Sequence, residues 1–276
     1  MKAEKILFIT QEINPYVPDS ILTPLGRELP ISVLDENRDI RAFMPKWGNI
    51  NERRNQLHEV IRLSGMNLII NDTDHQIIIK VASIAGTRMQ VYFIDNEDFF
   101  GKRLAEIDRE GNEYKDNVER AAFYARGVLE TVKKQRWTPE VIHCQGWISA
   151  LVPVYLKTAY AEEPSFRNCK IVYTVADSRL TLPTGDDFAQ ILEYRDAGAE
   201  CFKEFGNSLT PDELIKLAIK YSDGVTFVND NPKPELLEYA KAGGKLILDG
   251  QADVPGYIKF IDDVWSQGYV EKNEEE

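Results

Sequence analysis

The chain has 276 residues, of which 43% are hydrophobic, a composition typical of a globular protein with a substantial core. Its 45 acidic residues outnumber 33 Lys and Arg, and the net charge of −12 argues against a nucleic acid partner and against membrane insertion. Cys144, Cys169 and Cys201 are an odd number without C-x-x-C spacing, which predicts free thiols and a cytoplasmic location.

Short continuous apolar runs recur along the chain, starting with KILFIT near the N-terminus. That first run is too short for a signal peptide or a membrane span. Runs of this kind, bounded by polar or turn residues, are typical of strands buried on both faces in a parallel sheet. The predicted strands are residues 5–10, 39–44, 91–95, 141–144, 171–175 and 225–228.

Residues 66–94 have a different pattern, with three β-rich runs joined by turn residues at 71–74 and 85–87. This pattern predicts an antiparallel insertion. The spacing Asp72-Thr73-Asp74 also matches a D-x-D motif that some sugar-nucleotide transferases use to hold a divalent cation. Because strand-like runs flank it, we interpret it as a hairpin turn and predict no metal there.

Helical periodicity is clearest in residues 116–133, where apolar side chains recur at steps of three and four. Asp116 and Glu119 have the spacing of a capping box at its start.

A second capping box is predicted at Thr210-Pro211-Asp212-Glu213, for a helix that runs to Ser222 and stops at Gly224. Gly243-Gly244-Lys245 follows a helical segment, so we interpret it as a helix C-cap and not as a phosphate loop.

Strands that alternate with helices predict an α/β fold: one Rossmann-like, doubly wound, mostly parallel sheet with an antiparallel insertion. Ligands bind such sheets at the carboxyl ends of the strands. His143 falls within a strand, where a packed residue is the simpler interpretation. The loops at those ends are residues 11–16, 45–48, 95–101, 145–147, 176–179 and 229–231.

Common cofactor and nucleophile motifs do not occur: there is no G-x-G-x-x-G after the first strand, no G-x-x-x-x-G-K-[ST] and no G-x-S-x-G. The three histidines are dispersed along the chain. We therefore predict no cofactor and no metal, and we assign no catalytic residue.

The strand ends, taken in order, resemble bacterial glycogen synthases and plant starch synthases, the retaining glycosyltransferases of family 5. KILFITQEINPY resembles their first strand and loop, and MPKWG resembles M-P-R-Y-G. FIDNEDFFG and YKDNVERAAFYARGVLETV resemble F-I-D-x-x-x-F-F and Y-x-D-N-x-x-R-F-x-x-F-x-x-A. EVIHCQGWISALVP resembles D-V-V-H-x-H-D-W-H-T-A-L-V-P, and LIKLAIKYSDGVTFVND resembles the segment that closes the family's N-terminal domain.

The resemblance implies a GT-B arrangement, in which an N-terminal domain receives the glucan acceptor and a second lobe supplies most contacts to the nucleotide sugar. Residues 1–250 would be the N-terminal domain and residues 251–276 a C-terminal extension with an acidic tail. On this interpretation the nucleotide-sugar-binding lobe is lacking.

The chain departs from the family at positions that carry its chemistry. The loop K-T-G-G-L aligns with residues 18–22, Pro-Asp-Ser-Ile-Leu, which have no cation and no glycine. In H-D-W-H-T the second histidine, which contacts the reacting glucose, aligns with Ile148. The preceding His and Asp align with Gln145 and Gly146.

The resemblance also implies cleft residues that keep polar side chains or a tryptophan. Asp116 as a plain helix cap and Trp147 as core packing are at least as compatible with the pattern as sugar contacts are. Aromatic platforms for a sugar are predicted at Tyr16, Phe99, Phe100 and Trp147. The candidate substrate-binding residues are Glu12, Asp116, Asn117, Gln145, Trp147 and Asp177.

Three functions follow. The first is a non-catalytic protein that binds a glucan or nucleotide sugar in the cleft, or a partner protein where the second lobe would dock. The second is half of a retaining glucosyltransferase, moving glucose from ADP- or UDP-glucose to an α-1,4-glucan and completed in trans by a separate lobe. The third is an unrelated α/β enzyme activity at the same strand ends.

Overall fold

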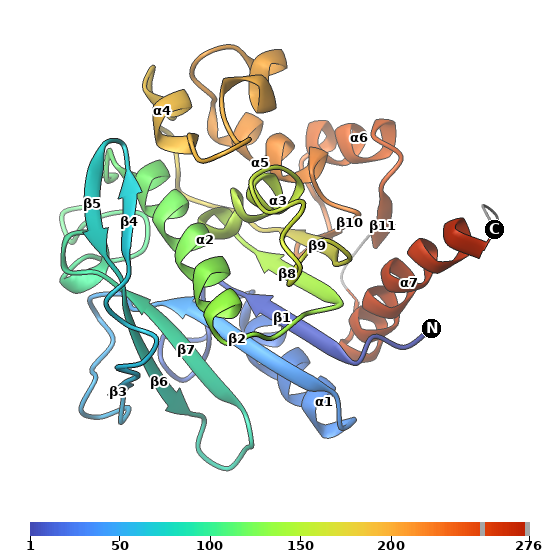
Figure 1. Cartoon of the computed structure of the whole chain (residues 1–276), viewed down its shortest axis with the longest axis horizontal. Coiled ribbons are helices and arrows are strands. Elements are labelled where there is room, and N and C mark those ends of the chain that lie inside the picture. Colours follow the sequence, from blue (N-terminus) through green and yellow to red (C-terminus); the bar gives the residue numbers. More distant parts are fainter. Residues whose placement is uncertain (249–251, 274–276) are drawn as a thin grey trace.

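A computed structural model describes residues 1–248 and 252–273 of the chain. Its main feature is a nine-stranded sheet of order β11-β10-β9-β8-β1-β2-β7-β6-β3 (Figure 1). All pairs from β11 to β7 are parallel, whereas β6 and β3 are antiparallel. The predicted doubly wound α/β fold is confirmed. The parallel strands are β1 (Lys5–Ile9), β2 (Asp39–Pro45), β7 (Gln90–Asp95), β8 (Val141–Gln145), β9 (Lys170–Val175), β10 (Gly224–Phe227) and β11 (Leu246–Leu248).

The predicted antiparallel insertion lies between β2 and β7 and contains β3 (His58–Glu59), β4 (Asn67–Ile70), β5 (Thr73–Gln76) and β6 (Ile78–Ser83). Strands β4 and β5 form a separate hairpin, and both residues of its turn, Asn71 and Asp72, have positive φ. This geometry confirms the hairpin interpretation of the D-x-D spacing.

The sequence pattern treats residues 75–84 as one strand, but the structure divides them at Ile77. β5 pairs with β4, and β6 pairs with β7. The carbonyl of Gln76, at the break, accepts a hydrogen bond from the side chain of Asn96 at 2.9 Å. Because the alternation continues across Ile77, the pattern alone does not mark the change of partner.

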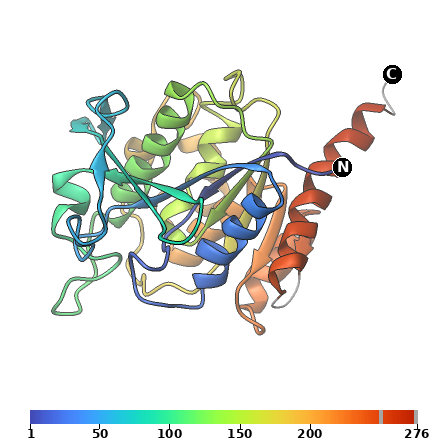
Figure 2. The same cartoon turned by 90° about the horizontal axis from the view of Figure 1, so that it is seen from below.

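Helices cover both faces of the sheet (Figure 2). α2 (Asn117–Lys134), α3 (Val152–Lys157) and α5 (Pro211–Lys220) lie together on one face, and α6 (Pro234–Ala242) packs against α5. α1 (Leu29–Asp35) and α7 (Val254–Asn273) lie side by side on the other. The short elements are η1 (Pro24–Glu28), η2 (Glu97–Gly101), η3 (Trp147–Ser149), α4 (Phe188–Leu192) and η4 (Ala199–Phe205).

The α5 capping box is confirmed, because the Glu213 amide donates to Thr210 and the Thr210 amide donates to Glu213. The α6 C-cap is confirmed too: Gly243 follows the helix, and Gly244 has a φ of 65°. The capping box predicted for α2 is wrong. The Asp116 side chain makes no cap hydrogen bond and pairs with Arg103 instead.

Gly224 does not stop α5, which ends at Lys220. It is the first residue of β10, and a Cβ at this position would come within 2.6 Å of Val264 and 3.1 Å of Phe260. Glycine is needed here because α7 packs directly on the strand.

Helix α7 is joined to the main core. Tyr257, Phe260 and Ile261 are buried, and the Asp262 carboxylate pairs with the buried guanidinium of Arg38 at 2.6 Å. Residues 254–265 therefore share one hydrophobic core with the preceding sheet. The acidic residues 274–276 lie outside the described part. Among the described residues, no helix has the length and apolar character to cross a membrane.

Candidate functional site

The chain order of the strands reverses between β1 and β8, and in doubly wound sheets the ligand crevice lies at this point, at the carboxyl ends of the strands. The loop after β1 contains Gln11, two residues beyond the strand, and the loop after β8 begins with Gly146. These two residues are in contact: a Cβ on Gly146 would come within 2.5 Å of Oε1 of Gln11. Side chains therefore fill the junction where a family member would carry an aspartate.

The residues that follow β8 are directed into the core. Gln145 is fully buried, and its Nε2 donates to the carbonyl of Leu25 at 3.1 Å. Trp147 and Ile148 are also buried. Ile148 presents no polar group at the position where the family resemblance places the second histidine.

His143 is packed inside the sheet, as predicted from its place in a strand. Its Nε2 lies 2.6 Å from Oγ1 of Thr174, which in turn lies 2.7 Å from Oγ1 of Thr226. Burial lowers the pKa of His143 to about 3, so the imidazole is neutral at physiological pH. This chain of side chains connects β8, β9 and β10 and has no access to solvent.

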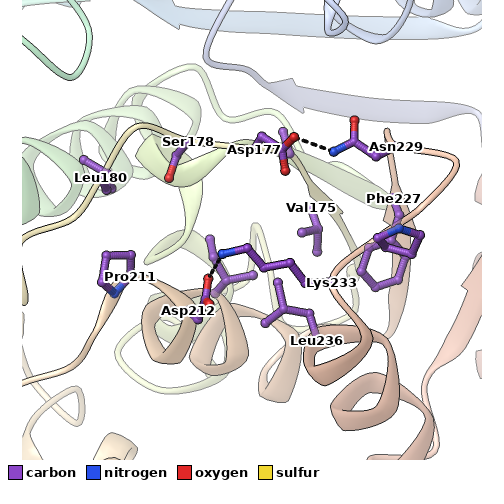
Figure 3. A pocket seen from close by; sticks show the side chains of 13 residues that line it. Val175, Asp177, Ser178, Leu180, Pro211, Asp212, Phe227, Asn229, Lys233 and Leu236 are labelled. Carbon is purple, nitrogen blue, oxygen red and sulfur yellow. Dashed lines mark hydrogen bonds and ion pairs between the residues drawn. The ribbon is translucent and has the colours of Figure 1, made fainter.

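An open pocket lies beyond β8, at the carboxyl ends of β9 and β10 (Figure 3). Its volume is about 320 Å³, within the usual range for small-molecule sites. Val175, Phe227 and Leu236 form its apolar part. The predicted residue Asp177 lines it and accepts a hydrogen bond from Nδ2 of Asn229 at 2.6 Å.

Lys233, which precedes α6, and Asp212, in the first turn of α5, form an ion pair of 2.6 Å in the same pocket (Figure 3). Asp212 and Lys233 carry opposite charges, and Asp177 and Asn229 offer acceptors and donors. The pocket therefore combines a small apolar surface with several hydrogen-bonding groups, a composition common in small-molecule pockets.

Residues 103–117 lead into α2 and border a smaller cavity beside the pocket; we call this segment the rim. The Arg103 guanidinium makes two hydrogen bonds to Asp116, one of them 2.6 Å long. Burial alone would raise the pKa of Asp116, but this ion pair lowers it below its usual value. Asp116 is thus an ionised partner of Arg103 and not a helix cap.

Asn117 is occupied by structural hydrogen bonds. Its Nδ2 donates to the carbonyl of Glu106 at 3.0 Å, and its Oδ1 accepts from Arg120 at 2.7 Å. Arg120 is fully buried, and burial lowers its pKa to about 9. It also donates to the carbonyls of Phe99, Leu104 and Ala105, and so it fixes the loop between η2 and α2.

Three carboxylates lie close together at the same rim. Burial raises the pKa of Glu106, the Glu12 and Glu113 carboxylates raise it further, and Arg179 partly opposes them. Glu12 is half-buried and accepts a hydrogen bond from Gln11 at 3.1 Å. Glu113 accepts from the amide of Thr181 at 2.7 Å, and this bond ties the rim to the loop after β9.

The predicted substrate-binding residues do not share one cavity: Asp177 lines the larger pocket, whereas others lie elsewhere. Asn117 and Trp147 line a small cavity of about 20 Å³, which adjoins the larger pocket because Leu180 and Pro211 line both. The four predicted aromatic platforms are wrong: Tyr16, Phe99, Phe100 and Trp147 are each less than 7% exposed and belong to the core.

Metal-ligand clusters and cysteine thiols were also compared with the predictions. In the described ranges, no three His, Cys, Asp or Glu side chains are grouped to hold a metal ion. Cys144, Cys169 and Cys201 are free and buried, as the sequence predicted.

The fold is that of a Rossmann-like α/β domain, and a pocket lies at the carboxyl edge of its sheet. A model of the starch synthase catalytic domain matches residues 5–249, and the chain belongs to this family.

Similar curated proteins support the same family assignment. The chain is 36% identical over 262 residues to the glycogen synthase of Chlorobium chlorochromatii (strain CaD3), covering 94% of this chain and 53% of that protein. The glycogen synthase of Chlorobium luteolum (strain DSM 273 / BCRC 81028 / 2530) is 34% identical over 263 residues, with the same coverage. The chain spans about half the length of the curated relatives it matches.

Among solved structures, the fold is similar to the catalytic domain of starch synthase IV from Arabidopsis thaliana bound to ADP and acarbose. The TM-score is 0.72 at 15% identity, and the match covers 91% of this chain and 52% of that chain. This similarity shows the fold.

Sequence reasoning missed half of the pocket. Asp212 and Leu236 were interpreted only as parts of helices and Lys233 was given no role, although the pocket lies where α5 and α6 begin. The available signal was the sequence Asn231-Pro232-Lys233-Pro234, which places a lysine in a rigid turn directly after a strand end.

Proposed function

We propose that this chain is a carbohydrate-binding domain of the glycogen and starch synthase family that has no transferase activity of its own. The observation that carries the proposal is the pocket at the ends of β9 and β10, where Asp177, Asn229, Asp212 and Lys233 surround an apolar base. The ligand class is a glucan or a nucleotide sugar. The starch synthase IV structure, with ADP and acarbose bound, supports that choice.

Three features of the β1–β8 junction support the absence of catalysis. Ile148 is buried where the family resemblance places a histidine, and Gly146 contacts Gln11 where it places an aspartate. Loss of one oriented hydrogen-bond donor at such a centre costs about 10²–10³ in rate. The loop at residues 18–22 also lacks the lysine and glycines that would face donor phosphates.

The second candidate function is half of a glucosyltransferase that a separate lobe completes in trans. A related possibility is a non-catalytic scaffold that binds a partner protein on the same face. Ile21 and Leu182, at the carboxyl edge of the sheet, are 49% and 42% exposed, and exposed apolar side chains favour a contact with another surface. A cytoplasmic location is part of the proposal and is supported by the three free thiols.

Calorimetric titration with maltooligosaccharides, ADP-glucose and UDP-glucose tests the binding function. Because each removed hydrogen bond to a charged group is worth about 1.5–3 kcal/mol, Asp177→Ala and Asn229→Ala should each weaken binding about tenfold or more. Asp263→Asn, an exposed change on α7, is the matched control and should bind like the parent. Absence of heat with all three ligands would exclude the carbohydrate-binding function.

Two further assays separate the alternatives. Purified protein that incorporates glucose from ADP- or UDP-glucose into glycogen would refute the non-catalytic proposal. A native pull-down with mass identification tests the second candidate: recovery of a nucleotide-binding lobe, followed by restored transfer on mixing, would favour the half-enzyme.

A further inference from the structure

A second open groove lies between the β4–β5 hairpin, helix α2 and the turn after α4. Its volume is about 590 Å³, and it shares no lining residue with the pocket at β9 and β10. One wall is apolar and consists of Met66, Leu68 and Ile69. Ile69 is 57% exposed, although it is a large hydrophobic side chain.

Arg126, on α2, lies in this groove without a counter-ion. It is only 5% exposed, and among the described residues it forms no ion pair and its Nε has no hydrogen-bond partner. Its Nη1 donates to the carbonyl of Ile69, and its guanidinium lies 3.9 Å from the ring centroid of Tyr194. A guanidinium is always charged, and a buried charge without an opposite charge is costly.

The nearest carboxylate on the same helix is already paired. Glu130, one turn after Arg126, accepts from Lys133 at 3.2 Å and from the hydroxyl of Tyr160 at 2.7 Å. The other carboxylate in the groove, Glu193, is exposed. In the described part of the chain, neither carboxylate forms an ion pair with Arg126.

A second guanidinium lies beside the first. Arg195 is exposed and lies 5.2 Å from the centroid of the same Tyr194 ring. Its backbone is fixed by two hydrogen bonds between Tyr194 and Ala197, of 3.0 and 3.1 Å. Its Nη1 donates to the carbonyl of Ala159 at 3.3 Å, so both guanidinium groups are held near the Tyr194 ring.

We propose that this groove binds a small metabolite through an oxyanion, a phosphate or carboxylate group held by Arg126 and Arg195. The planar guanidinium fork matches both groups and forms short, charge-assisted hydrogen bonds with them. The rest of the ligand would lie on the apolar wall at Ile69. This site is independent of the carbohydrate pocket, so either proposal can fail alone.

Calorimetric titration of the full chain with sodium phosphate and with sodium malonate, against sodium chloride at equal ionic strength, tests the site. We expect saturable heat with phosphate, malonate or both, and none with chloride. The comparison of the two anions identifies which oxyanion the groove prefers.

Variants locate the binding. Arg195→Ala and Ile69→Glu change exposed side chains, and each should weaken binding about tenfold or more, because one removes a charge-assisted hydrogen bond and the other adds a repelling carboxylate. Arg126→Lys keeps the charge but loses the fork and should weaken binding as well; circular dichroism checks its fold. Arg53→Ala, outside the groove, is the control and should have no effect.

The proposal is overturned if neither anion binds more than chloride does. It is also overturned if Arg195→Ala and Ile69→Glu both bind with the parent affinity, since the anion then lies elsewhere.

Discussion

Replacing Gly146 by aspartate tests the closed junction between β1 and β8, and it introduces the residue that the family motif carries there. Gly146 has φ 76° and ψ 174°, a conformation that is essentially restricted to glycine. A Cβ would also stand 2.5 Å from Oε1 of Gln11 and 3.2 Å from its Cβ. The substitution therefore has a backbone cost and a steric cost.

The two costs can be estimated separately. A side chain in this backbone region costs about 1–3 kcal/mol. Moving Gln11 aside breaks its 3.1 Å hydrogen bond to Glu12, which is worth about 1 kcal/mol. Gly146→Asp should thus lower the free energy of unfolding by about 2–4 kcal/mol. Urea denaturation followed by circular dichroism measures this change.

Two variants separate the contributions. In a Gln11→Ala background the clash and the hydrogen bond to Glu12 are both already absent, so adding Gly146→Asp should cost only the backbone part, about 1–3 kcal/mol relative to Gln11→Ala. Gly111→Asp is the matched control, because Gly111 also has positive φ but has open space around its Cβ position. If Gly146→Asp stays within about 0.5 kcal/mol of the parent, the junction is not closed as described.

Two other changes test the core and the rim. Asp262→Ala leaves the buried Arg38 guanidinium, whose side chain is 2% exposed, with Glu36 as its remaining ion-pair partner. Urea denaturation should show that the free energy of unfolding falls by about 3 kcal/mol. The control Asp263→Asn should change it by less than about 0.5 kcal/mol. Arg103→Met removes the partner that lowers the pKa of Asp116. A lowered carboxyl pKa stabilises the fold above the unfolded pKa of about 3.9 and loses that effect as the pH falls, so the variant should show a smaller loss of stability below about pH 4 than the parent. An unchanged pH profile would show that this ion pair contributes nothing.

Much of the fold was predictable because most of the parallel strands are buried on both faces and so are continuous apolar runs in the sequence; β11, which is only half-buried, was not predicted. The runs at β1, β2, β7, β8, β9 and β10 are all strands, and the Thr210 capping box forms as expected. The capping box depends on contacts between residues close in sequence, and the strands depend on burial of continuous apolar runs, so both can be recognised from local sequence.

The errors share a different cause. Asp116 has a capping residue's position, but Arg103 competes for its carboxylate. Gly224 resembles a helix stop, but the approach of α7 requires it. Phe99 and Phe100 resemble a sugar platform, but they are buried beneath the loop that Arg120 holds. In each case a partner distant in sequence decides the role of the residue.

The sequence by itself determined the family and the doubly wound fold, because the order of buried strands and the motifs at their ends are local patterns. It also determined that Ile148 cannot do the work of a histidine, since that depends on residue type alone. Only the tertiary structure decided that Gln11 fills the junction at Gly146 and that Asp177 meets Asn229, 52 residues later. Such contacts join separate strands and helices, and their geometry exists only once the sheet has assembled.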